Sequence, residues 1–557
     1  MAEANRPPCT ADAPVVHFVD SGHDVEVVDI WTGQRANALR AALRMTNEAF
    51  AEKLGTAVRT VAKWNAKPDA VPVSELQRAL DTALSRASAE ERARFVILSN
   101  AAQGAAEDVA PRGIADGREE DQRLNHDPAI GDALYWLDSH AAWPPGEARR
   151  RVRATLRKLD DDRLRRLVHD RNDVGQAQTA DALRAYYAVS AASPYRFYSA
   201  RCNGARRTTS VLTKAQWLNL GLVLGQGRDQ WVLDTSDMVI QSEPRLDKAA
   251  CDSAVTRLAE TLSLETRFVN APLYRLTAID LTPGRMAGAF GITSFVEYAL
   301  TLDLMENELV DAMSRGLTPA HGALPLRDRH VPDLAALTDL TRRICVGGPV
   351  TLTAIARSHG RRRGRGPDYV LLVQERSSRV LNAARRLAVI PKAFHQPLVD
   401  VGEDTDLLAT IEREMEEELL GRLELDGDQA QRSADPMHVT RLSEPMRWLI
   451  DHGDTEPWRT ECTAFGINAM SGNFEFASLV VINDDRWWEL YGGVIEANWE
   501  AEGLRRYSTQ DSGGLAALIN DPAWSNEGLF ALLEGLRRLR QLDSERIALL
   551  PSIEVES

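Results

Sequence analysis

Cysteine and long apolar runs are both scarce in this chain of 557 residues. Its five cysteines lie far apart, are odd in number and include no CxxC pair. This argues against a disulfide framework and against a cysteine-ligated zinc site. No apolar stretch approaches the roughly 20 residues of a membrane-spanning helix, and the first residues lack the basic and apolar parts of a signal peptide. The sequence therefore predicts a cytoplasmic protein with reduced, mostly buried thiols and no membrane partner.

Positive charge is also in short supply, because 66 lysines and arginines face 81 aspartates and glutamates, for a net charge of −15. An evenly negative surface repels nucleic acid, so a DNA-binding surface would have to be confined to one module. The P-loop, GxGxxG, HExxH and GxSxG motifs are all missing. Their absence argues against the nucleotide-binding and hydrolytic mechanisms that depend on them.

The first module begins at Trp31, where the pattern changes to short amphipathic helices. Three successive helices are predicted in the stretch GQRANALRAALRMTNEAFAEKLGTAVRTVAKWN. Their inner positions are Leu39, Leu43, Phe50, Ala51, Leu54, Val61 and Trp64. The Thr46 hydroxyl is placed to cap the second helix. Gly55 follows that helix, at a point where a left-handed backbone costs glycine little.

This spacing, unbroken from Met45 to Trp64, resembles the helix-turn-helix of the Xre/Cro family of repressors; a generic three-helix bundle is the alternative. In such a fold the second helix of the motif, here about Ala57 to Trp64, enters the major groove of DNA. The resemblance assigns DNA contacts to Asn47, Val58, Arg59, Thr60 and Lys63. The fork of Arg59 can bond guanine O6 and N7 together, and Asn47 can contact a phosphate.

Charge along the chain supports this assignment. Residues 31–86 contain nine lysines and arginines but five aspartates and glutamates, so this segment carries +4 within a chain of −15. A single motif of this kind makes few phosphate contacts, and two are normally presented together on a near-palindromic site. We therefore expect a homodimer bound to a double-stranded DNA operator.

The middle of the chain, residues 129–345, predicts a helical part followed by mixed α and β structure. Acidic residues interleave with the arginines of EARRRVRATLRKLDDDRLRRLVHD, which favours a solvated, ion-paired helix face over a DNA contact. APLYRLTAIDL reads as a strand, and Ser294 is placed to cap a later helix. The sequence does not indicate a function for this region, although dimerisation is one option.

A stretch crowded with glutamate, TIEREMEEELLGR, begins at Thr410. Glu414, Glu417 and Glu418 are related by i, i+3 and i+4, so their carboxylates converge on one side of a helix. The neighbouring side carries Leu408, Ile411, Met415 and Leu419 toward a sheet. We predict a helix from about Asp404 to Leu420, a strand before it at Tyr369 to Gln374, and two strands after it that pair across Ser471, Gly472 and Asn473.

This order of strand, proline-containing loop, acidic helix and further strands resembles the Nudix fold. The family's helix carries R-E-(apolar)-x-E-E-x-G-(apolar), and the residues that match are Arg413, Glu414, Met415, Glu417 and Glu418. The resemblance implies that Glu414, Glu417 and Glu418 bind Mg²⁺, which would bridge a diphosphate and stabilise its hydrolysis, with Glu417 and Glu418 as catalytic carboxylates. Arg413 can pair with Glu417 and orient it, and Glu475 could serve as a distal acid.

Several departures from the family pattern weaken the expectation of catalysis. Leu420 stands where the family has its helix-ending glycine, and Gly421 comes one place late. Val399 and Thr405 stand where the upstream glycine and glutamate would fall. IPKAFHQP replaces the usual Pro-Gly-Gly turn. We therefore expect a degenerate Nudix-like domain that is not an active enzyme, with a glutamate-rich solvated helix as the alternative.

A basic loop, ARSHGRRRGRGP, precedes the predicted strand at Tyr369. Arg361, Arg362 and Arg363 could bind the phosphates of a nucleotide-like ligand through charge-assisted hydrogen bonds. The alternative is a solvated connector.

Together these features predict a multidomain fold in which an all-α helix-turn-helix domain is followed by an α+β middle region and an α/β Nudix-like domain. The predicted segments are a flexible arm (1–30), the helix-turn-helix domain (31–100), a linker (101–128), the middle region (129–345) and the Nudix-like domain with its C-terminal helix (346–557). We expect a sequence-specific transcription regulator that senses a phosphorylated small molecule. The alternative is a metal-dependent diphosphate hydrolase with an accessory DNA-binding arm.

Overall fold

The computed structural model divides the chain into two compact units, Met1–Asp116 and Gly117–Ser557. It describes residues 31–43, 45–56, 60–61, 63–64, 72, 74–87, 95, 119–234, 246–358, 366–378, 380, 384–420, 437, 441–451, 457–493, 495, 498, 501–547 and 552–556. None of the helices in these ranges has both the length and the apolar character needed to cross a membrane. The predicted arm, residues 1–30, lies outside the described residues.

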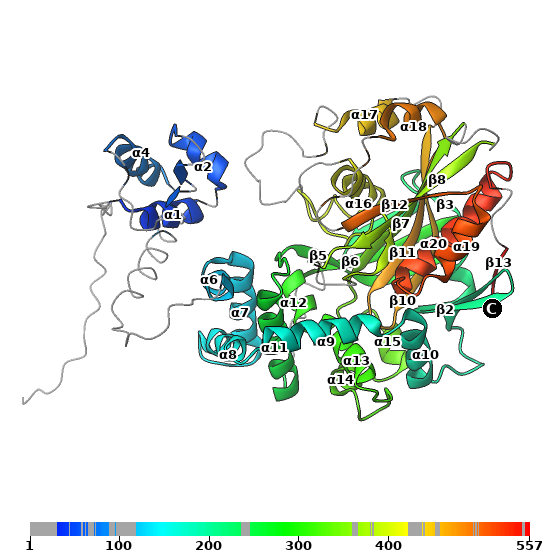
Figure 1. The fold of residues 1–557 in the computed structure, drawn as a ribbon, viewed down its shortest axis with the longest axis horizontal. Coiled ribbons are helices and arrows are strands. Elements are labelled where there is room, and N and C mark those ends of the chain that lie inside the picture. The colour runs from blue at the N-terminus through cyan, green and yellow to red at the C-terminus, as the bar shows by residue number, and fades with distance from the viewer. Residues whose placement is uncertain are drawn as a thin grey trace, which may run out of the picture. The chain divides into compact units, whose positions relative to one another are not determined.

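The smaller unit is helical in its described residues (Figure 1). Its helices are α1 (Gly33–Ala42), α2 (Asn47–Lys53) and α4 (Ser74–Ser85), and further helical positions are Thr60, Val61, Lys63 and Trp64. The core buries Leu39, Phe50, Val61 and Trp64, as their spacing predicts, and it also buries Trp31. Leu43 is the exception among the predicted inner positions, since it is only half-buried at the edge of this core.

The larger unit is built on a mixed sheet whose described strands follow the order β12-β8-β7-β11-β10-β2-β1-β13, with β3 beside β10 and β9 beside β8. Its strands are β1 (Arg196–Cys202), β2 (Ala205–Thr213), β3 (Leu222–Val223), β7 (Gly347–Arg357), β8 (Asp368–Arg376), β9 (Leu387–Val389), β10 (Trp458–Asn468), β11 (Phe474–Ile482), β12 (Ala501–Ser508) and β13 (Ile553–Val555). β7 and β11 run parallel, and the other pairs in this sheet are antiparallel. A second sheet joins β4 (Asp229–Leu233), β6 (Arg285–Ser294) and β5 (Pro272–Thr282).

Helices cover both faces of the large sheet, because alternate residues of its central strands point to opposite sides. Leu371 and Val373 of β8 pack with α19 (Ser512–Asn520) and α20 (Asn526–Leu542) on one face. Val370 and Leu372 face the other core, which includes α16 (Leu407–Glu414) and the second sheet. Figure 1 shows α20 and α16 on the two sides of the sheet.

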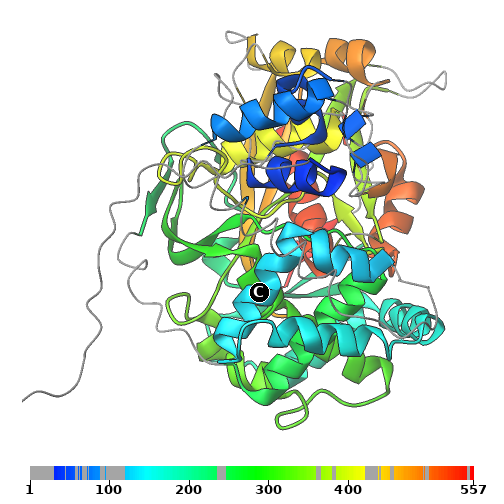
Figure 2. The ribbon, with the colours of Figure 1, turned by 90° about the vertical axis from the view of Figure 1, so that its left-hand side faces the viewer.

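The larger unit has twelve further α-helices in its described residues. They are α6 (Glu119–His126), α7 (Pro128–His140), α8 (Glu147–Leu156), α9 (Asp161–Asp173), α10 (Gln176–Tyr187), α11 (Lys248–Ser263), α12 (Phe295–Ala299), α13 (Asp303–Ser314), α14 (Pro325–His330), α15 (Leu334–Thr338), α17 (Glu444–Asp451) and α18 (Asp485–Tyr491). α11 packs against α6, α7 and α8, and α13 packs against α9 and α14. Figure 2 shows the helices from α6 to α15 in cyan and green.

Two predicted boundaries are corrected by this fold. A division at residue 346 would cut through one sheet, because β1 and β2 of the middle region pair with β10 and with β13 near the C-terminus. The end of the predicted linker at residues 101–128 is helical, since α6 belongs to the larger unit. The first error arises because strand pairing over hundreds of residues leaves no local pattern in the sequence.

Several local predictions are confirmed. Ser294 caps α12 by accepting a hydrogen bond from Glu297 N. β10 and β11 pair across the predicted turn, where Gly472 has a φ of +80°. Cys202, Cys251, Cys345 and Cys462 are free and buried, and burial raises the pKa of Cys462 to about 12.

Candidate functional site

The smaller unit forms the turn that its sequence predicts between two helices. Thr46 Oγ1 accepts a hydrogen bond from Ala49 N at 3.1 Å and so caps α2. Gly55 has a φ of +66°, and Thr56 N then donates to Ala51 O at 2.8 Å. These contacts end α2 sharply and set the direction of the helical residues that follow.

Of the residues predicted to contact DNA, the structure places three. Lys63 is exposed, whereas Thr60 and Asn47 are half-buried. Val58 and Arg59 lie outside the described residues. Lys63 lies close in sequence to two core residues, Val61 and Trp64, so this segment turns one face inward and one face outward. Other exposed basic side chains of this unit are Lys53, Arg78 and Arg86.

The acidic helix of the larger unit departs from the regular helix that its pattern predicts. α16 begins after Asp406, which caps it by accepting from Leu408 N at 2.9 Å. From Met415 to Leu419 the chain forms a π-helical turn. Such a turn spaces its hydrogen bonds by five residues rather than four, so Glu414 and Glu418 are no longer held in α-helical register. Ile411, Met415 and Leu419 remain on the buried side as predicted.

The glutamates of this helix have separate partners. Glu414 forms an ion pair with Arg413 at 2.9 Å, so Arg413 does not pair with Glu417 as predicted. Glu416 accepts hydrogen bonds from the backbone N and the hydroxyl of Ser443. Glu418 Oε2 accepts from Lys392 N at 3.0 Å. In the parts of the chain that the structure describes, no three Asp, Glu, His or Cys side chains are grouped to hold a metal ion.

A different set of charged residues meets inside the larger unit, and we call it the carboxylate cluster: Glu306, Lys392, Glu475 and Glu527. Lys392 Nζ lies 2.5 Å from Glu527 Oε1. Asn468 Nδ2 donates to the other oxygen of Glu527 at 3.1 Å. Sequence reasoning singled out only Glu475 of this cluster.

The carboxyl groups of the cluster differ in their affinity for protons. Burial, reinforced by the charge of Glu527, raises the pKa of Glu475 well above its usual range. Burial, with Asp303 and Glu527 nearby, raises the pKa of Glu306 to about 7. Burial opposes ionisation of Glu527 too, but Lys392 outweighs it and lowers the pKa of Glu527. The cluster therefore contains one firm ion pair, a Glu475 whose neutral form is favoured by burial, and a Glu306 that can gain or lose a proton near neutral pH.

Close backbone packing positions Lys392. The loop IPKAFHQP lies along β7, where His395 N donates to Gly347 O at 2.7 Å. A Cβ at Gly348 would lie 2.2 Å from Ala393 O, so only glycine permits this approach. Glu527 is positioned by the first turn of α20, where Ser525 Oγ accepts from Gly528 N at 3.1 Å.

These residues do not fit the magnesium site that the resemblance implies. Mg²⁺ requires several oxygen ligands in near-octahedral geometry, whereas Glu414 and Glu418 are held by Arg413 and by the Lys392 backbone. The ammonium of Lys392 already neutralises Glu527, and it would repel a divalent cation placed beside it. We therefore derive no catalytic step through a metal at Glu414, Glu417 and Glu418.

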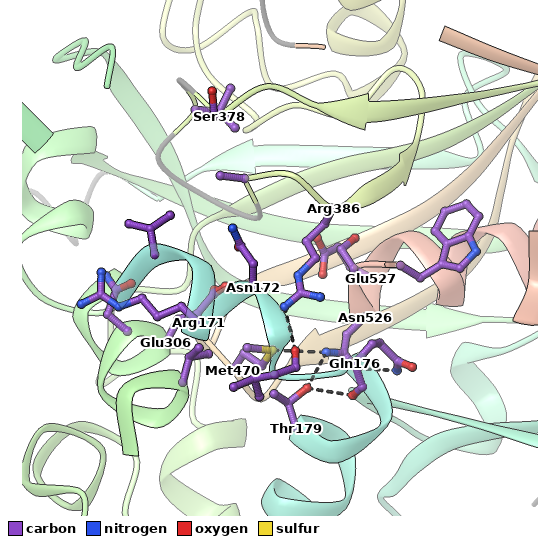
Figure 3. A pocket seen from close by; sticks show the side chains of 18 of the residues that line it. Arg171, Asn172, Gln176, Thr179, Glu306, Ser378, Arg386, Met470, Asn526 and Glu527 are labelled. Atoms are coloured by element: carbon purple, nitrogen blue, oxygen red, sulfur yellow. Dashed lines mark hydrogen bonds between the residues drawn. The ribbon is translucent and has the colours of Figure 1, made fainter. Parts of the chain in front are cut away.

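A cavity of about 150 Å³ opens beside the carboxylate cluster (Figure 3). Its polar lining comprises Arg171, Asn172, Gln176, Thr179, Arg257, Thr266, Glu306, Asn307, Ser378, Arg386, Asn468, Ser525, Asn526 and Glu527. The apolar side chains of Val310, Met470 and Trp524 also face it. These residues come from segments that are far apart in the sequence, and no local spacing reveals them.

One wall of the cavity is held by hydrogen bonds between α10 and α20 (Figure 3). Gln176 Nε2 donates to Asn526 Oδ1 at 2.8 Å, and Asn526 Nδ2 donates to Thr179 Oγ1 at 3.2 Å. All three side chains are buried. Satisfied buried amides of this kind fix a wall rigidly, because breaking either bond leaves an unpaired polar group.

The basic loop contributes nothing to this site in the described residues. Arg361, Arg362 and Arg363 lie outside them. Arg357, the first arginine of the loop, forms a two-point ion pair with Asp368, with distances of 2.9 and 2.6 Å. This arginine therefore has a structural partner at the edge of β7 and β8.

No protein-family model matches this chain, and no curated protein matches it significantly in sequence. The function proposed below therefore depends on the residues and geometry already described.

Proposed function

We propose that this chain is a DNA-binding transcription regulator whose smaller unit binds an operator and whose larger unit binds a small ligand. The observation that best supports DNA binding is the exposure of Lys63 beside the buried residues Val61 and Trp64, after the turn at Gly55. A short helix with an apolar inner face and a basic outer face suits insertion into a DNA groove. The resemblance to the Xre/Cro helix-turn-helix agrees with this geometry.

The proposed regulator acts as a homodimer. One small unit of this size can bury only a limited surface on DNA, and paired half-sites supply the missing affinity and specificity. The surplus of positive charge in residues 31–86 would supply the salt-dependent part of the binding free energy.

In this proposal the larger unit is a sensor. The cavity beside the carboxylate cluster provides a concave, partly apolar site with a few converging polar groups, which is the usual form of a small-molecule site. A ligand there changes DNA binding only if it binds the DNA-competent and incompetent arrangements with different affinities.

A diphosphate hydrolase is the second candidate, and one observation favours it. Burial raises the pKa of Glu306, which lines the cavity, to about 7, and a protonated carboxyl group can act as a general acid. Incubation with Mg²⁺ and either inorganic pyrophosphate or a panel of small diphosphate esters separates the two candidates. Turnover that disappears in Glu306→Gln would support the hydrolase, and no turnover on any substrate would leave the sensor as the supported candidate.

Fluorescence anisotropy with duplex DNA from upstream of the chain's own gene tests the DNA-binding proposal. We expect Arg59→Ala to weaken binding by about 1–3 kcal/mol and Lys63→Ala to reduce the slope of log affinity against log salt by about 1. Lys248→Ala is the matched control, because Lys248 is an exposed lysine of the larger unit. Unchanged binding by both Arg59→Ala and Lys63→Ala would contradict the proposal.

A further inference from the structure

Most charges around the cavity are already neutralised by partners within the larger unit. Arg171 pairs with Glu260 at 2.9 Å and with Asp311 at 2.5 Å. Arg257 pairs with Asp303 at 2.7 Å. Glu527 is neutralised by Lys392, as described above. Three arginines and two glutamates line the cavity. The ion pairs neutralise two of these arginines, Arg171 and Arg257, and one of the glutamates, Glu527.

Arg386 is the arginine that remains. Its guanidinium donates to Val174 O at 2.8 Å, and no carboxylate lies within ion-pair distance of it in the described part of the chain. Burial lowers the pKa of Arg386, while the charges of Glu306, Glu527 and Asp173 act in the opposite direction. A half-buried charge without a close counter-ion is costly, so Arg386 would gain from an anion bound in the cavity.

Two helix N-termini add to this preference for an anion. Gln176 is the first residue of α10, and Ser525 and Asn526 begin α20; all three line the cavity. The positive end of a helix dipole favours negative charge within its first turn. The amides of Asn172 and Asn307 also line the cavity, and neither has a hydrogen-bond partner in the residues that the structure covers. They are available as donors to the same ligand.

The size of the cavity limits the ligand. A cavity of about 150 Å³ is comparable to one that holds benzene in other proteins. A ligand of about six to ten non-hydrogen atoms therefore fits, and a nucleotide does not. Val310, Met470 and Trp524 offer contacts to an apolar body next to the charged end.

We infer that this cavity binds a small organic anion, in which one carboxylate or phosphate group pairs with Arg386 and the body of the molecule contacts Trp524 and Met470. The inference rests on the proposal that the larger unit binds a ligand, and it does not depend on DNA binding. It assigns Arg386 as the residue that selects for charge and Asn172 and Asn307 as the donors that orient the anionic group.

Isothermal titration calorimetry on the full-length protein tests this site with benzoate and inorganic phosphate as probes. Benzamide serves as the uncharged probe of matched size. We expect benzoate to bind and benzamide to bind at least tenfold more weakly. Arg386→Gln should weaken benzoate binding by about tenfold or more, because it removes a charge-assisted bond. Preferential binding of inorganic phosphate would identify phosphate rather than carboxylate as the anionic group.

Arg385→Gln is the control, since Arg385 is the exposed neighbour of Arg386 and loses the same charge. This variant should bind benzoate as the native chain does. Near-ultraviolet circular dichroism checks that Arg386→Gln remains folded, and Arg386→Lys should restore part of the affinity. Equal binding by the native chain and Arg386→Gln, or no binding of either anion at millimolar concentration, would overturn the inference. Anisotropy with operator DNA on the same samples shows separately whether the DNA-binding proposal fails.

Discussion

The two units of this molecule differ in how deeply their described charged side chains are buried. In the smaller unit, the core of Trp31, Phe50 and Trp64 is apolar, and basic residues such as Lys63 are exposed. The larger unit also has exposed charges, but it encloses several charged groups. Arg327 is fully buried and donates to Ala469 O, and Glu475 and Glu527 are nearly so.

This difference separates two kinds of functional evidence. An exposed charge costs little free energy and is free to meet a partner, so its meaning depends on the surface around it. A buried charge must be paired or hydrogen-bonded, so each one that lacks a counter-ion is informative. Lys63 is an example of the first kind, and the half-buried Arg386 approaches the second. The predictions below test whether the distinction holds.

The largest expected effect is the loss of stability when a largely buried lysine of the larger unit is replaced, compared with an exposed lysine of the smaller unit. Lys392→Met leaves Glu527 buried beside Glu475 without its counter-ion, and the side chain of Lys392 is only 12% exposed. Breaking a buried pair in this way should lower the free energy of unfolding by about 3–5 kcal/mol. Lys63→Met removes the same charge at an exposed position, and it should change stability by less than about 0.5 kcal/mol.

Urea unfolding of the full chain measures both changes. The double variant Lys392→Met, Glu527→Gln separates lost packing from unpaired charge, because it also removes the carboxylate charge that Lys392→Met leaves without a counter-ion. It should recover much of the lost stability. A similar loss in Lys63→Met and Lys392→Met would show that the two units do not differ as we describe.

A smaller effect, of opposite sign in the two units, is expected from a glycine-to-alanine change. Gly55 in the smaller unit has a φ of +66°, so Gly55→Ala should destabilise it by about 1 kcal/mol even though a Cβ would meet no atom within 4 Å. Gly131 lies inside α7, also with no atom within 4 Å of a Cβ. Gly131→Ala should stabilise the larger unit by about 0.5–1 kcal/mol.

Differential scanning calorimetry distinguishes these outcomes through the direction of the shift in melting temperature. Since both sites have room for a methyl group, backbone conformation is the variable that differs. If Gly55→Ala raised the melting temperature, the turn after α2 would not have the left-handed geometry that directs the next helix.

The contrast between the units also explains what the sequence could predict. In the smaller unit the informative residues lie close together in the sequence: Thr46 caps α2, Gly55 ends it, and the buried Val61 and Trp64 follow within nine residues. Local propensity and spacing are sufficient for such features. The same is true of Ser294 and of the hairpin at Gly472 in the larger unit.

The site in the larger unit could not be predicted in this way. Glu306, Lys392 and Glu527 come from α13, the loop after β9 and α20, and the sheet order brings them together. The glutamates of the acidic helix gave a strong local signal, yet the π-helical turn and the ion pair between Arg413 and Glu414 alter their arrangement. Regular spacing predicts where side chains would lie on an ideal helix, and this helix is not ideal at its C-terminal end.

The smallest predicted effect is a pH dependence of anion binding in the larger unit. Burial raises the pKa of Glu306 to about 7, so its carboxyl group is neutral below that pH and charged above it. The groups that face it are Asp303, Glu475, Glu527, Lys392, Arg257 and Arg386. A charged Glu306 competes with the ligand for Arg386, so benzoate binding should weaken by about threefold to fivefold from about pH 6 to about pH 8.

Glu306→Gln removes the titrating group and keeps a side chain of similar size. In this variant benzoate affinity should stay constant over the same pH range and match that of the native chain at the acidic end. Benzamide binding should be independent of pH in both proteins, because it carries no charge for Glu306 to repel. If the native chain bound benzoate more tightly as pH rose, the enclosed charges would not govern the cavity, and the contrast between the two units would lose its functional meaning.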